Sequence, residues 1–298
     1  MTNFSFIIPH KNCPDLLMRC LNSIPKRDDI QIIVIDDNSD IDKKPNMGNI
    51  NAEVVLLNKE ESNGAGHARN LGIERATGKW LMFADSDDMF TECLDSFLDK
   101  YTDDEESDIV YLNADNIDEE GNRWPFIIDH YIANYQKKKF YSEKVLRYGI
   151  WTPWSRMVKR ELVSINNLRF EEIPTGNDMM FSLNCSKYAN KIAAESMVLY
   201  LYFVPQNRSL TEFNRRKISN ISYRIELGQR QNRLYKSVGY LFWDTNIAMF
   251  RRPPLGIDKV SYQKEYKKEL KRHKVGLCGE LYHSIVNRIG VMLGIIKM

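Results

Sequence analysis

The first hundred residues alternate short apolar runs with segments of helical periodicity, and this alternation limits the fold more than any other feature. The apolar runs lie at 4–9, 30–35, 54–57 and 79–84. Residues 15–24 carry apolar side chains at helical spacing, and a glycine-containing segment opens a second helical stretch that reaches Ala76. Strands joined by helices through short connections form a mainly parallel sheet with helices on both faces. The sequence therefore predicts an α/β fold.

The distribution of charge predicts two regions. Residues 206–298 carry 19 Lys and Arg against 7 Asp and Glu, whereas residues 1–205 carry 23 against 33. From about residue 206 the pattern is also helical, with candidate helices at 215–238 and 261–274. We therefore expect an α/β domain over 1–205 and a basic, mainly helical extension over 206–298.

The composition excludes several classes of protein. Hydrophobic residues make up 43% and charged residues 28% of the chain, which is too apolar for a disordered protein. Five cysteines without CxxC spacing argue against a disulfide framework and a zinc site, and favour a reducing compartment. The start of the chain lacks the pattern of a signal peptide, and no run of about 18 apolar residues occurs. We expect a cytoplasmic protein without a transmembrane helix.

Four polar residues follow the apolar run at 79–84: Asp85, Ser86, Asp87 and Asp88. We call residues 85–88 the acidic turn. Ligands bind beyond the carboxyl ends of the strands in parallel sheets. Hard cations such as Mg²⁺ or Mn²⁺ prefer carboxylate oxygens and keep other positions for water or phosphate. The acidic turn therefore predicts a divalent metal that bridges phosphate groups, and the alternative is an acidic helix N-cap.

A second polar group, Asp36 and Asp37, ends the run at 30–35. A carboxylate there can accept a hydrogen bond from a nucleobase or a ribose, although residues 36–40 are also typical of a turn. Arg69 follows Gly64 and Gly66 at the expected start of a helix. The glycines would let a ligand approach the backbone, and Arg69 could contact a base carbonyl or a phosphate.

Four segments, in this order, resemble family 2 of the glycosyltransferases with the GT-A fold, many of which build bacterial surface polysaccharides. They are 6–9 (Phe-Ile-Ile-Pro), 33–39 (Ile-Val-Ile-Asp-Asp-Asn-Ser), 63–70 (Asn-Gly-Ala-Gly-His-Ala-Arg-Asn) and 78–88 (Gly-Lys-Trp-Leu-Met-Phe-Ala-Asp-Ser-Asp-Asp). The resemblance is dense over residues 1–100 and looser over 150–210. It implies a Rossmann-like, mixed but mainly parallel sheet, and inverting transfer of a sugar from a nucleoside diphosphate sugar, most commonly a UDP-sugar.

The resemblance also implies a donor site. Residues expected to border the donor nucleotide are Pro9, His10, Asp36, Asp37, Arg69, Asp85 and Ser86. Either Asp36 or Asp37, together with Arg69, would contact the base. Within the acidic turn, Asp85 would lie nearer the ribose and Asp87 nearer the metal, with both as candidate ligands of Mn²⁺ or Mg²⁺.

The catalytic base is expected in the segment 174–181, where Asp178 occupies the place of the family's Glu-Asp motif. Asp178 would take the proton of the acceptor hydroxyl as that hydroxyl attacks the anomeric carbon. Asn177 stands where the family usually has Glu, so this motif departs from the pattern. The alternative is that Asp178 caps a helix over 179–189.

Two further segments resemble parts of the family's site. Trp151 and Trp154 lie in the segment that lines the acceptor side, where aromatic faces suit sugar rings, and the alternative is that they are core residues. Arg208 lies in a segment that resembles a loop over the diphosphate, where it could stabilise the charge of the departing phosphate.

The basic C-terminal region suggests a membrane surface as a partner. Residues 284–296 are largely apolar and follow the Lys-rich stretch at 264–274, so 259–297 could lie on the inner face of the cell membrane. This would suit a saccharide acceptor carried on a polyprenyl lipid. The alternatives are packing on the protein itself or a homodimer contact. No nucleic-acid-binding motif is present, and no nucleic acid is expected as a partner.

Two other functions remain open at the level of sequence. A sugar nucleotidyltransferase also combines carboxylates, a metal and an α/β sheet, but it usually has a glycine-rich basic loop near the N-terminus, which residues 9–12 do not provide. A non-catalytic module that binds nucleotide sugar or lipid would lose no activity when Asp87 or Asp178 is replaced.

Overall fold

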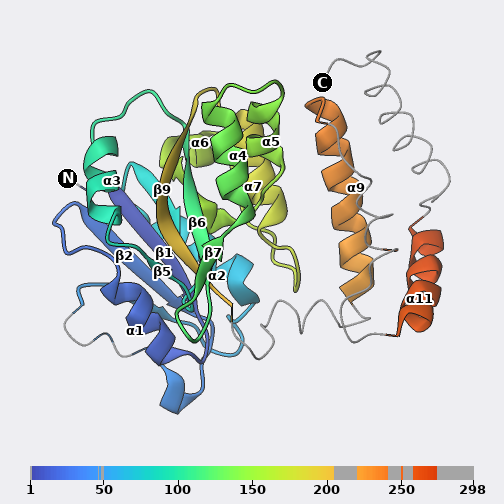
Figure 1. Ribbon diagram of the computed structural model, residues 1–298. Coiled ribbons are helices and arrows are strands. Elements are labelled where there is room, and N and C mark those ends of the chain that lie inside the picture. Colours follow the sequence, from blue (N-terminus) through green and yellow to red (C-terminus); the bar gives the residue numbers. More distant parts are fainter. Residues whose placement is uncertain are drawn as a thin grey trace. The chain divides into compact units, whose positions relative to one another are not determined.

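The computed structural model describes residues 2–45, 47, 50–204, 220–240, 250 and 258–273. The chain divides into two units (Figure 1). The first comprises residues 1–172 and 177–206, and the second comprises 173–176 and 207–298.

The N-terminal half of the first unit has the strand–helix alternation that the sequence predicts. Its strands are β1 (Phe4–His10), β2 (Ile30–Asp36), β3 (Glu53–Leu56) and β4 (Trp80–Phe83), and its helices are α1 (Pro14–Asn22) and α2 (Gly64–Arg75). The four strands are parallel and lie in the order β3-β2-β1-β4. Strands β1 and β4 are completely buried, as expected for apolar runs covered on both faces.

The other half of this unit makes the sheet mixed. Its strands are β5 (Met89–Phe90), β6 (Ile109–Ile117), β7 (Arg123–Pro125), β8 (Arg156–Lys159) and β9 (Ile192–Phe203). The full order is β3-β2-β1-β4-β8-β6-β9-β5, with β7 paired to β6. Because β8 is antiparallel to both β4 and β6, and β6 is parallel to β9, the carboxyl ends of β4, β6 and β9 meet at one edge.

Helices cover this sheet. The remaining helices of the unit are α3 (Leu94–Tyr101), α4 (Ile127–Gln136), α5 (Ser142–Tyr148), α6 (Arg160–Ile165) and α7 (Met179–Tyr188), with 3-10 turns η1 (Ile41–Lys43) and η2 (Pro153–Ser155). Helix α2 packs on β1 and β2, and α4 packs on β6 and β9. Figure 1 shows α4, α5, α6 and α7 grouped together. The predicted α/β fold is confirmed.

A glycine sets how closely α2 approaches the sheet. A Cβ atom at Gly72 would lie 2.3 Å from Cγ2 of Ile7, a fully buried residue of β1. No larger residue fits between helix and strand without displacing one of them. The close packing fixes the start of α2 relative to the carboxyl ends of the strands.

The described part of the second unit contains α9 (Ile221–Ser237) and α11 (Lys259–Arg272). They pack on each other through a small core formed by Ile221, Ile225, Tyr262, Tyr266 and Leu270. Asp258 caps α11 by accepting a hydrogen bond from the backbone N–H of Ser261 at 2.7 Å. None of the helices in the described ranges combines the length and hydropathy needed to cross a membrane. The apolar segment predicted at 284–296 lies outside those ranges.

Candidate functional site

The candidate site lies where the order of the strands reverses. The chain passes from β1 to β2 and β3 on one side, and then returns to β4 on the other side of β1. Such a switch point leaves a crevice beyond the carboxyl ends of the central strands, and ligands of α/β sheets bind there. His10 ends β1, Asp36 ends β2, and Asp85 follows β4. The predicted donor residues therefore come together at one end of the sheet.

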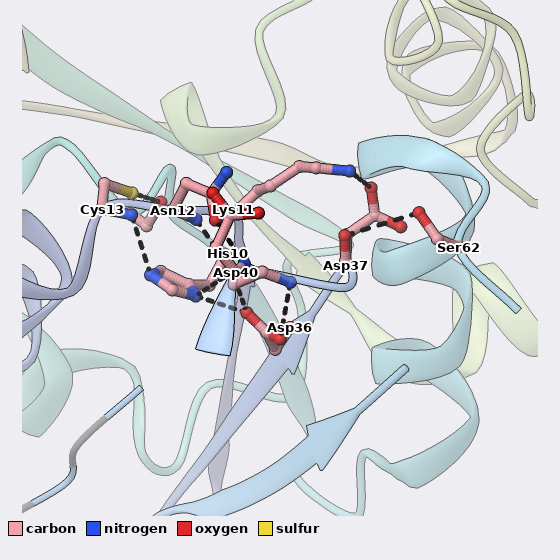
Figure 2. A network of polar contacts seen from close by, with 10 residues as sticks. His10, Lys11, Asn12, Cys13, Asp36, Asp37, Asp40 and Ser62 are labelled. Atoms are coloured by element: carbon pink, nitrogen blue, oxygen red, sulfur yellow. Dashed lines mark hydrogen bonds and ion pairs between the residues drawn. The ribbon is translucent and has the colours of Figure 1, made fainter. Parts of the chain in front are cut away.

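His10 and Asp36 form a buried pair at this edge (Figure 2). Nδ1 of His10 lies 2.7 Å from Oδ1 of Asp36, and both side chains are 0% exposed. The backbone N–H of Cys13 donates to Nε2 of His10 at 3.2 Å. Because Nε2 accepts, the proton of the ring is on Nδ1 and is donated to Asp36. The pair joins the ends of β1 and β2.

Ser39 uses the remaining acceptor capacity of Asp36. Its backbone N–H donates to Oδ2 of Asp36 at 3.1 Å, and its hydroxyl donates to Oδ1. The hydroxyl of Ser39 also accepts from the N–H of Asn12 at 2.8 Å. Asp36 is thus part of an internal network that orders residues 10–13 and 36–40. The turn chemistry expected for residues 36–40 is therefore present, while contact of Asp36 with a nucleotide stays a prediction.

Asp37 is bonded to the start of α2. Its Oδ1 accepts from the backbone N–H groups of Asn63 at 3.1 Å and Gly64 at 3.2 Å, and Lys11 lies 3.2 Å from its Oδ2. A carboxylate at a helix N-terminus accepts hydrogen bonds from N–H groups that have no partner within the helix, and its negative charge interacts favourably with the positive end of the helix dipole. Asp37 therefore holds in place the helix that carries Arg69.

Arg69 connects two of the predicted motifs. Its guanidinium donates to Oδ1 of Asp85 at 2.5 Å and to Oδ1 of Asn177 at 3.1 Å. The same group lies 5.4 Å from the centre of the Phe170 ring, and its Nε is buried without a partner among the described residues. The contact joins the acidic turn to Asn177, and hence to its neighbour Asp178, across more than 90 residues of sequence.

Gly66 allows the segment before Asn177 to reach α2. A Cβ atom at Gly66 would lie 2.1 Å from the carbonyl oxygen of Glu171, a distance that no real contact permits. The sequence suggests that this glycine admits a ligand, whereas the structure fills the space with the chain's own backbone. Glu172 reinforces the contact by accepting from Asn63 Nδ2 at 2.8 Å and by pairing with His67 at 3.0 Å.

The acidic turn is closed by a hydrogen bond from the N–H of Asp88 to the carbonyl of Asp85 at 3.1 Å. The side chain of Asp85 is 32% exposed, and Ser86 contacts the thiol of Cys13 at 3.2 Å. Burial and the neighbouring charge of Asp85 raise the pKa of Asp87 to about 6. The turn therefore concentrates negative charge that lacks full compensation within the protein.

Three residues that the sequence did not single out hold this turn. The hydroxyl of Tyr200 accepts from the N–H of Asp85 and donates to Asp88, whose second oxygen accepts from the N–H of Phe203. Arg19 of α1 donates to the carbonyl of Asp87 and lies over the Phe203 ring. No local pattern marks these residues, because their partners are about 70 to 115 positions away in sequence.

Asp178 directly precedes α7. Its side chain makes no cap hydrogen bond to this helix, while its carbonyl accepts from the N–H of Ser182 at 3.0 Å. The capping alternative for the side chain therefore has no support in this geometry. Asp178 belongs to the first unit, next to Asn177 and its contact with Arg69.

The two candidate acceptor tryptophans differ in their surroundings. Trp154 is 3% exposed and stacks with Tyr200 at 4.8 Å and Tyr202 at 5.5 Å, so it is a core residue in this structure. Trp151 is partly exposed and stays a candidate. Pro9 is buried within β1, where it pairs with Ile35 of β2. Arg208 lies outside the described residues.

The acidic turn fits a divalent metal by the chemistry of its side chains. Among the described residues no group of three or more His, Cys, Asp or Glu side chains forms a metal cage. A metal that bridges a diphosphate needs only one or two carboxylates, because phosphate and water oxygens fill the other positions. Asp85 and Asp87 supply that number. Their crowded charge, which raises the pKa of Asp87, is what a cation would neutralise.

The family model described as glycosyl transferase family 2 matches residues 5–164. The chain is 24% identical over 291 residues to glycosyltransferase GlyG of Streptococcus pneumoniae serotype 4, covering 91% of this chain and 90% of GlyG. It is 24% identical over 216 residues to the poly(ribitol-phosphate) beta-N-acetylglucosaminyltransferase TarS of Staphylococcus aureus, covering 68% of this chain and 35% of TarS.

Solved structures share the fold. The S. aureus TarS 1–349 structure in complex with UDP-GlcNAc has a TM-score of 0.57 at 17% identity, over 91% of this chain and 72% of that one. The mannosyltransferase PcManGT of Pyrobaculum calidifontis, in complex with GDP-Man and Mn²⁺, has a TM-score of 0.52 at 14% identity, over 99% and 81%. With the family match over more than half of its length, the chain belongs to glycosyl transferase family 2 and has the GT-A fold.

Proposed function

We propose that this glycosyltransferase moves a sugar, with inversion, from a nucleoside diphosphate sugar to a saccharide or a polyprenyl-linked saccharide in bacterial polysaccharide synthesis. A UDP-sugar is the first donor to test, because the similar TarS structure was solved with UDP-GlcNAc. Family membership favours transfer over the nucleotidyltransferase and the non-catalytic alternatives.

One observation carries the proposal, namely that Arg69 contacts Asp85 and Asn177 at once. The acidic turn and the segment of Asp178 are separated by about 90 residues in sequence, yet one side chain bridges them. A transferase needs its donor diphosphate and its general base on the two sides of one anomeric carbon. The bridge supports a common site for both.

In this proposal Asp178 acts as the general base. Its carboxylate takes the proton of an acceptor hydroxyl while the oxygen of that hydroxyl forms a bond to the anomeric carbon. At the same time the bond between the anomeric carbon and the diphosphate oxygen breaks, and its electron pair stays on the diphosphate. Attack from the face opposite the leaving group inverts the anomeric centre. Asp85 and Asp87 would hold Mn²⁺ or Mg²⁺, which neutralises charge on the diphosphate. Arg208 is proposed to contact the same diphosphate.

The remaining donor residues divide into direct and indirect contributors. Asp37 and Arg69 are proposed to contact the base, since Asp37 is bonded to the start of α2 and Arg69, within α2, is bonded to Asp85 beside the crevice. His10, Asp36 and Pro9 shape the nucleotide-binding edge by joining β1 to β2, and Ser86 contributes within the acidic turn. Trp151 remains the proposed contact on the acceptor side.

The test is a panel of UDP, GDP, dTDP and their sugars, measured by thermal shift and isothermal titration calorimetry with and without Mn²⁺. A nucleotide that binds the folded state raises Tm by mass action. Asp87→Asn should lose the Mn²⁺-dependent part of the affinity. Asp178→Asn should keep nucleotide affinity but lose turnover, including slow hydrolysis of the donor. If no nucleotide in the panel binds the wild-type protein, the proposal is wrong.

We also propose that residues 259–297 bring the enzyme to an anionic membrane surface. Within the described part, α11 buries Tyr262, Tyr266 and Leu270 and exposes on its opposite side a basic face formed by Lys264, Lys267, Lys268, Lys271 and Arg272. Such a face favours anionic lipid headgroups. The protein should co-sediment with vesicles that contain phosphatidylglycerol and not with phosphatidylcholine vesicles. The substitutions Lys264→Gln, Lys267→Gln and Lys271→Gln together should weaken this binding. Sedimentation that does not depend on lipid charge would contradict the proposal.

A further inference from the structure

Tyr200 of β9 contacts the acidic turn at two points. Its hydroxyl accepts a hydrogen bond from the backbone N–H of Asp85 at 3.0 Å and donates one to Oδ2 of Asp88 at 2.7 Å. The hydroxyl oxygen of Tyr200 is therefore hydrogen-bonded to both the first and the last residue of the turn. Tyr200 is itself fully buried, so neither contact is exchanged with water.

Asp88 extends this connection to the end of β9. Its second oxygen accepts from the N–H of Phe203 at 2.7 Å, and the next residue, Val204, donates from its N–H to the carbonyl of Ile117 at 2.8 Å. The carboxylate of Asp88 is thus bonded to β9 at two residues, and β9 is fixed to β6. The turn is attached to the sheet as well as to its own strand, β4.

The ring of Tyr200 is held independently of its hydroxyl. It stacks on Trp154 with centroids 4.8 Å apart and planes 9° apart, and it meets Phe90 edge-on at 5.2 Å. Burial and the nearby carboxylates raise the pKa of Tyr200 well above its usual value, so the hydroxyl keeps its proton and remains a donor to Asp88. A phenylalanine at this position would keep the packing and lose only the two hydrogen bonds.

We infer that Tyr200 is a positioning residue for the donor, which sets the backbone of the acidic turn so that Asp85 and Asp87 face the metal and the diphosphate. This inference rests on the proposed function. Carboxylates that must share a cation with phosphate oxygens need fixed positions, and fixed positions come from supporting hydrogen bonds. The competing explanation is that the two bonds only satisfy a buried hydroxyl and contribute to stability alone.

The experiment compares Tyr200→Phe with Tyr111→Phe. Tyr111 is a matched control, because it is also fully buried and its hydroxyl has one partner within the described ranges, Ser186, at 2.9 Å, without contact with the turn. UDP affinity is measured by calorimetry with Mn²⁺ at a temperature where circular dichroism shows every variant folded. Both substitutions should lower Tm. Tyr200→Phe should weaken UDP binding about tenfold, as expected for a lost positioning contact, and Tyr111→Phe should leave it unchanged.

A second readout separates positioning from stability. Hydrolysis of UDP-GlcNAc by Tyr200→Phe should show a raised KM for the donor and a higher Mn²⁺ concentration at half-maximal rate. Asp88→Asn should show the same shifts, and the double variant should be no worse than either single one, because both act through one contact. Wild-type UDP affinity in Tyr200→Phe, or an equal loss in Tyr111→Phe, overturns the inference and leaves the proposed function intact. Failure of the wild-type protein to bind any nucleotide overturns both.

Discussion

Replacement of Asp36 with Asn tests the buried network at the ends of β1 and β2 by changing a single atom. The carboxylate accepts from Nδ1 of His10 at 2.7 Å, from the N–H of Ser39 at 3.1 Å and from the hydroxyl of Ser39. An Asn side chain has one acceptor oxygen and one donor NH₂ group. If the oxygen keeps His10 and the hydroxyl, the NH₂ group faces the N–H of Ser39, and two donors oppose each other.

The cost follows from these contacts. A buried donor left unpaired costs about 1–3 kcal/mol. The two bonds that remain lose their charged acceptor, and bonds to charged groups are stronger than neutral ones by roughly 1 kcal/mol. We expect the free energy of unfolding to fall by about 3–5 kcal/mol, which corresponds to a decrease in Tm of roughly 6–20 °C for a domain of this size.

Urea denaturation followed by circular dichroism measures the loss. Asp40→Asn is the matched control, because Asp40 is 64% exposed and lies 3.5 Å from Lys43, a surface pair worth less than about 1 kcal/mol. If Asp36→Asn is as stable as Asp40→Asn to within about 1 kcal/mol, a typical effect of a single substitution, the network does not stabilise the strand ends as argued.

Three further predictions concern the site. Gly66→Ala should lower the free energy of unfolding by about 1–3 kcal/mol or more, measured by urea denaturation, since the added Cβ would lie 2.1 Å from the carbonyl oxygen of Glu171. An unchanged stability would mean that α2 and the segment of Glu171 can move apart. Arg69→Lys should weaken UDP binding, measured by calorimetry, about tenfold, because a single ammonium group cannot reach Asp85 and Asn177 at once as the planar guanidinium does. An unchanged affinity would contradict the role of this double contact in donor binding. Burial and Asp85 raise the pKa of Asp87 from 3.8 to about 6, so the metal-free folded state binds this proton more tightly than the unfolded state does. The stability that it contributes is present below about pH 4 and is lost as the pH rises through about 6, and Asp87→Asn should flatten that part of the stability–pH profile.

Local sequence patterns predict the strands and helices of the N-terminal half of the first unit. The apolar runs at 30–35 and 79–84 become β2 and β4 within about one residue, because short buried strands between turn signals have few other structures available. Strand β9 escaped prediction. Its pairing partners, β6 and β5, lie far away in sequence, and its register shifts against β6 at Asn113 and so breaks the simple alternation.

The residues of the candidate site also include some that the local sequence predicts and some that it does not. The acidic turn could be predicted because its residues are adjacent, and carboxylates after a buried strand carry a chemical meaning of their own. Neither Tyr200 nor Arg19 could be found, since a tyrosine in a strand or an arginine in a helix is ordinary until the chain brings it to a partner. Trp154 shows the converse, because its aromatic face suits a sugar, yet it is used for packing against Tyr200 and Tyr202.

The attachment of the acidic turn to β9 also affects when the enzyme becomes competent during its synthesis. Strands β1 to β4 can pair as soon as about 90 residues have left the ribosome, but Tyr200 and Phe203 follow Asp85 and Asp88 by 115 residues each. At roughly 5–20 residues per second, this separation is a delay of about 6–23 s. During that interval Arg19 and Arg69 can already contact the turn, but the nascent chain lacks the hydrogen bonds of Tyr200 and Phe203 that attach the turn to β9. We expect a ribosome-bound fragment that ends before β9 to bind no nucleotide, so that donor is not captured by an unfinished enzyme.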